Sequence, residues 1–126
     1  MTPPRRLTPR TPLLWFGILG PPFAWASQHV FGMGMTLAAC NVAGARWGIP
    51  VVAWTIAATV TAAVITTLAG LASVKVWRDT RDAPEHPPPS RIHFLSVVGM
   101  SIAPLFLFII LMSGLVTSVL GECRQG

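Results

Sequence analysis

The sequence predicts an all-α membrane protein with three transmembrane helices, because both its composition and its patterning are typical of that class. Of the 126 residues, 52% are hydrophobic and only 10% are charged, whereas soluble domains carry about 25% charged residues. Three long segments, residues 23–40, 51–74 and 92–120, contain no Asp, Glu, Lys or Arg. A spanning helix needs about 20 apolar residues, and in lipid its backbone polar groups must be satisfied within the segment. We therefore expect each segment to be a helix that crosses a membrane.

Basic residues are divided unequally between the two sides of these helices, which predicts their orientation. Arg46 and Arg124 lie on one side, and the other side carries the remaining seven of the nine: Arg5, Arg6, Arg10, Lys75, Arg78, Arg81 and Arg91. Cytoplasmic loops carry an excess of Lys and Arg, so we expect a cytoplasmic N-terminus and a periplasmic C-terminus in a bacterial inner membrane. We interpret the net charge of +5 as basic residues that orient the protein in the membrane and attract anionic membrane lipids. No nucleic-acid partner is expected.

The N-terminal segment raises the question of where the first helix begins. Residues 1–12 hold four prolines and three arginines, which predicts a disordered cytoplasmic tail. Residues 13–20 are apolar, and Pro21 and Pro22 follow them. Because proline is favoured in the first turn of a helix, we expect the first spanning helix at about 21–40. A cleaved secretory leader is the alternative, but the proline pair and the apolar character that continues to Leu37 count against it.

The rest of the chain supplies two further helices, so that residues 13–126 form one three-helix transmembrane domain. The second helix, at about 50–75, is rich in small residues at a spacing of four, as in Ala58 and Ala62 or Thr66 and Gly70. Such pairs let helices approach closely, so this helix should lie at the centre. Residues 76–91 read as a cytoplasmic loop. The third helix, at about 92–120, should be kinked by Pro104.

The two cysteines lie on the same expected side of the membrane. Cys40 ends the first helix and Cys123 follows the third, and a periplasm is an oxidising compartment. A disulfide between Cys40 and Cys123 is the leading hypothesis, with free thiols, metal binding or redox exchange as alternatives.

Two hydrogen-bonding residues, Gln28 and His29, interrupt the first apolar segment. The leading interpretation is that they contact a neighbouring helix or another subunit. His29, Met33 and Cys40 also share one helix face, and imidazole, thioether and thiolate suit copper(I). They are the candidate metal ligands. No cofactor is expected, because neither His86 nor His93 lies at the depth that a second haem ligand would need.

Catalysis and ion-coupled transport are disfavoured by the distribution of acidic residues. All four lie outside the spans: Asp79, Asp82, Glu85 and Glu122. Ion coupling generally uses an intramembrane carboxylate, and no catalytic triad, phosphate-binding loop or zinc signature is present. We therefore expect that the chain is not an enzyme.

One string carries a resemblance. Residues 19–25 (LGPPFAW), His29, and cysteines at positions 40 and 123 resemble small three-span bacterial membrane proteins encoded beside haem-copper cytochrome c oxidase genes. Glu122 departs from the Asp or Pro that such proteins tend to have there. The resemblance implies a respiratory neighbourhood and no defined activity.

These observations lead to three functional hypotheses. The first is an accessory subunit or assembly partner of a larger membrane complex, such as a respiratory terminal oxidase, with other integral membrane subunits as partners. The second is a small homo-oligomeric channel or holin-like protein, and the third is a copper-handling membrane factor.

Overall fold

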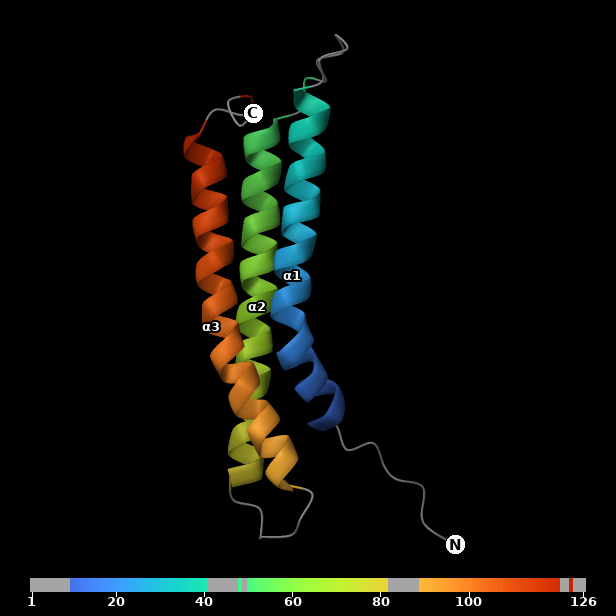
Figure 1. Cartoon of the computed structure of the whole chain (residues 1–126), viewed down its shortest axis with the longest axis vertical. Helices are drawn as coiled ribbons and strands as arrows, with labels where there is room; N and C mark the ends of the chain where they lie inside the picture. The colour runs from blue at the N-terminus through green and yellow to red at the C-terminus, as the bar shows by residue number, and fades with distance from the viewer. Residues whose placement is uncertain (1–9, 41–47, 49, 82–88, 121–122, 124–126) are drawn as a thin grey trace, which may run out of the picture.

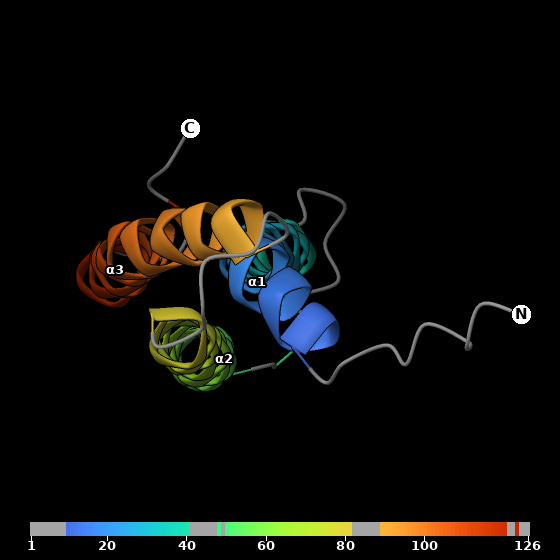
Figure 2. The ribbon, with the colours of Figure 1, turned by 90° about the horizontal axis from the view of Figure 1, so that it is seen from below.

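The computed structural model is a bundle of three helices (Figure 1) and describes residues 10–40, 48, 50–81, 89–120 and 123. The helices are α1 (Arg10–Ala39), α2 (Val51–Arg81) and α3 (Pro89–Val119). They run alternately up, down and up, and seen end-on they form a triangle in which each helix packs against the other two (Figure 2). The described residues therefore confirm the all-α fold class.

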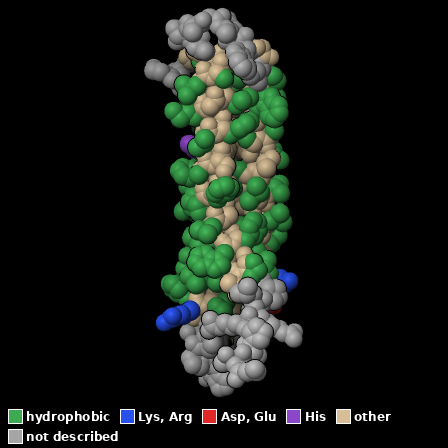
Figure 3. All heavy atoms as spheres, turned by 90° about the vertical axis from the view of Figure 1, so that its right-hand side faces the viewer, with side chains coloured by type: hydrophobic (Ala, Val, Ile, Leu, Met, Phe, Trp, Pro, Cys, Tyr) green, Lys and Arg blue, Asp and Glu red, His purple; other side chains and the backbone are tan. Residues whose placement is uncertain are grey.

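The two ends of the bundle differ in chemistry, and we name them accordingly. At the disulfide end, Cys40 and Cys123 are covalently joined. At the charged end lie all the charged side chains that the structure describes: Lys75, Arg78, Asp79, Arg81 and Arg91. On the face drawn in Figure 3, basic side chains appear only near this end. Between the ends the described surface shows many apolar side chains, with backbone and other side chains exposed among them and a histidine at the edge.

The interior is built from small and polar residues. The face of α2 that turns inward follows a spacing of four and three alternately: Thr55, Thr59, Ala62, Thr66, Ala69, Ser73, Val76 and Thr80. This spacing averages 3.5 residues per turn, the period that keeps one seam of a helix against nearly parallel neighbours. Because these side chains are short, the three helices can approach closely along their length.

The outer surface is apolar, which inverts the arrangement of a soluble bundle. Large apolar side chains are exposed on every helix, for example Phe23 at 74%, Leu71 at 60% and Leu105 at 60%. Two helical segments, Val51–Arg81 and Arg91–Val119, are long and apolar enough to cross a membrane. This composition supports a membrane protein.

Helix α1 begins earlier than the sequence predicts. It starts at Arg10, not near residue 21, and contains Pro21 and Pro22 in its interior. The segment before the prolines bends away from the rest of α1 (Figure 1), as expected where prolines remove backbone hydrogen bonds. Tertiary packing holds this segment helical, since Pro21 is fully buried and Gly17 lies directly against Ser73 of α2.

Helices α2 and α3 are also longer than expected at the charged end. Residues 76–81 and 89–91, predicted as loop, are helical. The reason is a set of contacts between the two helices: the Trp77 ring stacks on His93 with centroids 6.2 Å apart, and Oγ1 of Thr80 lies 3.1 Å from Nδ1 of His93. Residues 1–9, 41–47 and 82–88 lie outside the described residues, and with them most of the expected tail and loops.

Candidate functional site

Gln28 lies where the three helices meet in the half of the bundle nearer the disulfide. Its side chain is only 7% exposed. The amide Nε2 donates a hydrogen bond of 2.9 Å to Oγ1 of Thr59 on α2 and a longer one of 3.4 Å to the backbone carbonyl of Ile110 on α3. One side chain of α1 is thus bonded to both other helices, which agrees with the expectation that Gln28 contacts a neighbouring helix.

The orientation of the Gln28 amide follows from its partners. The hydroxyl of Thr59 donates its own proton to the carbonyl of Thr55 at 2.8 Å, so it can only accept from Gln28. The carbonyl of Ile110 is likewise an acceptor. Both partners require the NH₂ group, and Oε1 therefore points elsewhere. This buried oxygen has no hydrogen-bond partner among the described residues.

The backbone of α3 packs closely against Thr59 at Gly114, and the missing side chain of this glycine leaves room for Thr59. A Cβ atom placed on Gly114 would lie 2.5 Å from Cγ2 and 2.6 Å from Oγ1 of Thr59, well inside van der Waals contact. Only glycine therefore leaves Thr59 in the position that Gln28 uses.

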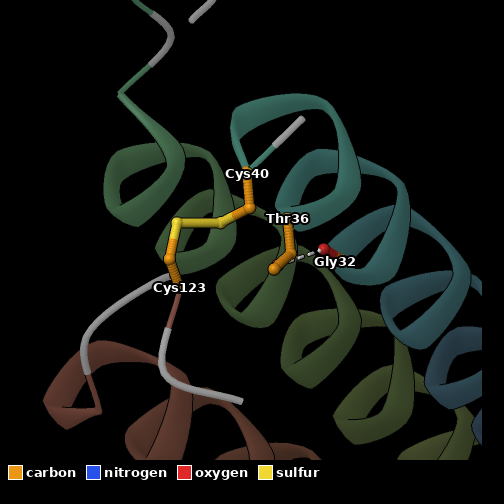
Figure 4. Close-up of a disulfide and its surroundings, with 4 residues drawn as sticks. All are labelled: Gly32, Thr36, Cys40 and Cys123. Atoms are coloured by element: carbon orange, nitrogen blue, oxygen red, sulfur yellow. Dashed lines mark hydrogen bonds between the residues drawn. A yellow bond between two sulfur atoms is a disulfide. The ribbon is translucent and has the colours of Figure 1, made fainter. Parts of the chain in front are cut away.

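A groove of about 730 Å³ runs between α1 and α3 beside Gln28. It is lined by Gln28, His29, Met33 and Thr36 from α1, by Thr55 from α2, and by Phe108, Met112 and Thr117 from α3, among others. At one end of the groove lies Thr36, one turn below Cys40 of the disulfide (Figure 4). Trp25 is not part of this lining, but its ring is 4.9 Å from that of His29 and meets the ring of Phe106 edge to face with centroids 6.0 Å apart.

A second groove, of about 430 Å³, lies between α1 and α2 on the other side of Gln28. Its lining includes Phe23, Phe31, Trp54 and Ala58, and the rings of Phe31 and Trp54 are 6.4 Å apart. Gln28 lines both grooves and separates them.

The candidate copper ligands do not form a three-residue site in this structure. Cys40 and Cys123 are bonded, with an Sγ–Sγ distance of 2.09 Å and Cα atoms 5.8 Å apart. The structure places the two sulfur atoms at disulfide distance, as the disulfide hypothesis expects, and a bonded Cys40 has no thiolate to offer. His29 and Met33 are exposed on the outer side of α1. Among the described residues, no group of three His, Cys, Asp or Glu side chains could hold a metal ion.

The predicted packing residues divide into three situations. Ala62 and Thr66 are buried in the interior, and Gly70 lies so near α3 that a Cβ there would be 3.0 Å from that of Ala103. Ala58 lines the groove between α1 and α2. His29 lies outside the bundle, where its ring is 4.9 Å from that of Trp25.

Sequence reasoning did not identify the partners of Gln28. Thr59, Ile110 and Gly114 complete the site, and none of them was singled out. The alternating four-and-three spacing along α2 is the signal that places Thr59 on the inner face, whereas pairs at a spacing of four do not single it out.

Compared with known proteins, the chain matches no family model, no curated protein and no solved structure.

Proposed function

We propose that this chain is an integral membrane accessory subunit or assembly partner of a larger membrane complex, with all three helices in the membrane. The N-terminus and the charged end would face the cytoplasm of a bacterial cell, and the disulfide end would face the periplasm. A respiratory terminal oxidase is the host that the resemblance of residues 19–25 suggests.

The distribution of side chains supports membrane embedding of all three helices. On α1, Phe23, Val30 and Met33 are 74%, 74% and 68% exposed, whereas the polar side chain of Gln28 is buried. Water would favour the reverse arrangement, with apolar groups inside. The basic residues of the charged end agree with the cytoplasmic side of a membrane.

The observation that carries the accessory-subunit proposal is the position of His29. It is exposed on the apolar outer surface of α1, at the edge of the groove between α1 and α3, and its ring lies 4.9 Å from that of Trp25. It lies ten residues from the end of α1 at Ala39, or about 15 Å at 1.5 Å per residue, near the middle of a hydrocarbon layer about 30 Å thick. Polar side chains at that depth are costly unless they have a partner, and they commonly bond to another helix.

The structure of a single copy of the chain supports the channel hypothesis and the copper-handling hypothesis less well. A pore through this bundle would have to pass Ile110, Thr66 and Ser73, which are fully buried, so a channel would require several copies. A copper site would lack the thiolate of Cys40 while the disulfide is formed.

Affinity capture from membranes in mild detergent tests the proposal. Wild-type protein should retain a second integral membrane protein in fixed stoichiometry. His29→Leu should retain at least about fivefold less, because one interhelical hydrogen bond contributes about 1 kcal/mol. The matched control is Met33→Leu, which changes another exposed side chain one turn away and should retain the partner.

The proposal fails if wild-type protein is recovered alone or only as multiples of itself. It also fails if His29→Leu and Met33→Leu retain the partner equally. Because both side chains lie outside the bundle, neither variant should disturb the fold, which circular dichroism checks.

A further inference from the structure

A cation and two aromatic rings form a cluster between α2 and α3 at the charged end, away from Gln28. The guanidinium of Arg81 lies over the ring of Trp77, 5.5 Å from its centroid. The same indole stacks on the ring of His93 of α3, with centroids 6.2 Å apart and planes inclined by 29°. Because a cation is attracted to the face of an aromatic ring, this contact restricts where the guanidinium of Arg81 lies.

A hydrogen bond between α3 and α2 holds the two rings in place. Oγ1 of Thr80 lies 2.8 Å from the carbonyl of Val76 and 3.0 Å from that of Trp77, and it donates its one proton to these carbonyls. Thr80 therefore accepts a hydrogen bond from His93, whose Nδ1 is 3.1 Å away. Thr80 is only 7% exposed, whereas Arg81 is exposed, so a cation at the surface rests on a buried, bonded support.

The surroundings of Arg81 favour an anion. Of the described residues, Asp79 is the one that carries a carboxylate. It is two positions from both Trp77 and Arg81, so at 100° per residue it lies about 160° around α2 from each of them. Lys75 precedes Asp79 by one turn and shares its side of the helix. Among the described side chains, the guanidinium over Trp77 thus has no carboxylate on its side of α2.

The cluster lies at the level where a membrane-crossing α2 would meet the lipid head groups. Helix α2 is long and apolar enough to cross a membrane, and its 31 residues extend about 46 Å at 1.5 Å per residue. A bilayer with both head-group layers is about 40–45 Å thick, and Trp is enriched at its interfaces. One turn deeper lie the apolar side chains of Val74 and Val97, and Val97 is 41% exposed. A lipid can contact this surface and Arg81 together, whereas a free phosphate ion cannot.

We propose that the junction of α2 and α3 at the charged end binds an anionic phospholipid whose phosphate contacts the guanidinium of Arg81. With all three helices in the membrane, the acyl chains of this lipid lie along Val74 and Val97. General attraction to anionic lipid would depend on the number of basic residues, whereas this site depends on the guanidinium held over Trp77. The site belongs to one copy of the chain, so this proposal and the accessory-subunit proposal can fail separately.

Competition between two lipids tests the site. The full chain, with its disulfide intact, is incubated in a neutral detergent with equal amounts of phosphatidylglycerol and phosphatidylcholine that have the same acyl chains. Native mass spectrometry then measures how much of each lipid the protein retains. Parallel samples contain either sodium phosphate or sodium chloride at the same ionic strength, which distinguishes a lipid phosphate from a free one.

Wild type should retain phosphatidylglycerol about tenfold more than phosphatidylcholine, the ratio that one charge-assisted hydrogen bond supplies. Arg81→Gln should lose most of this preference. The matched control is Lys75→Gln, which removes the same charge from the other side of α2 and should change the preference less than about twofold. Arg81→Lys keeps the charge without the planar guanidinium and should lower the preference about threefold.

Equal retention of the two lipids by wild type would overturn the proposal. Equal losses from Arg81→Gln and Lys75→Gln would also overturn it, because general attraction predicts them, and so would an unchanged preference in Arg81→Lys. Displacement of phosphatidylglycerol by sodium phosphate, beyond that by sodium chloride, would identify the occupant as a free anion and contradict a lipid site. Arg81 and Lys75 are both exposed, so the variants should fold, which circular dichroism checks.

Discussion

Nε2 of Gln28 donates a 2.9 Å hydrogen bond to Oγ1 of Thr59, a residue 31 positions away that is itself bonded back to its own helix. This bond joins α1 to α2, and the contact with the Ile110 carbonyl extends it to α3. Many of the buried side chains are small alanine, serine and threonine, so a directional bond that reaches all three helices constrains their register here.

Thr59→Val should reveal the contribution of this bond. The change keeps the shape of the side chain and removes the acceptor, and we expect the free energy of unfolding to fall by about 1 kcal/mol. Thr67→Val is the control, because Thr67 makes the same bond to the carbonyl four residues back, at 2.8 Å, but is exposed. Reversible unfolding in mixed micelles measures both, and equal losses would show that the bond to Gln28 does not stabilise the bundle.

Gly99→Ala should destabilise the crossing of the three helices at Ser73. The new Cβ would collide with Oγ of Ser73 and lie 3.2 Å from its Cβ. Gly17 of α1 lies against the other side of this serine, so the side chain of Ser73 has little room to move away. Overpacking of this kind costs about 1–3 kcal/mol. Ser73→Gly combined with Gly99→Ala should recover part of the loss.

Gly34→Ala provides the contrast on α1, since nothing lies within 4 Å of the added methyl group. It should be neutral or stabilise slightly, because alanine favours helix more than glycine does. Thermal unfolding of the purified variants compares the two substitutions. A loss from Gly34→Ala as large as that from Gly99→Ala would contradict the close approach at Ser73.

Removing the disulfide with Cys40→Ser and Cys123→Ser should loosen one end of the bundle selectively. These residues join the ends of α1 and α3 on either side of a groove, and loss of a native disulfide typically costs about 2–4 kcal/mol. We expect faster amide hydrogen exchange in the last turns of α1 and α3 and little change near Trp77. Uniform acceleration along all three helices would contradict this assignment.

His93→Ala should fray the charged end of α2. It removes the hydrogen-bonding partner of Thr80 and the ring that stacks on Trp77. Amide exchange should accelerate in the last two turns of α2 and remain unchanged around Gln28. If exchange in those turns does not change, the contacts with α3 are not what extends the helix there.

The existence and number of the helices were predictable, because segments without charge are visible directly in the sequence. The residues at which the helices begin and end were harder to predict. The proline pair at 21 and 22 signals a helix start by local preference, yet α1 continues through it, because Gly17 and Pro21 pack in the interior. Such packing depends on residues more than fifty positions away, which no local rule includes.

The candidate site was also only partly predictable from the sequence. Gln28 is conspicuous because it is polar in an apolar segment, and the cysteine pair follows from orientation. The neighbour His29 attracts the same attention, but its side chain is exposed at the outer edge of the groove between α1 and α3, whereas Gln28 is buried. Which of two adjacent polar residues faces inward depends on the rotation of α1 about its axis, and that is set by contacts of Gly17, Ala24 and other inner-face residues along the helix.

Both proposals require that α1 crosses a membrane together with α2 and α3, and labelling with a membrane-impermeant maleimide on intact cells tests this most directly. One variant carries Pro12→Cys with Cys40→Ser and Cys123→Ser, and the other carries Cys123→Ser alone and keeps the thiol of Cys40. We predict that Cys40 is labelled in intact cells and that the cysteine at position 12 is labelled only after the membrane is opened. Labelling of both positions from the same side would contradict the account.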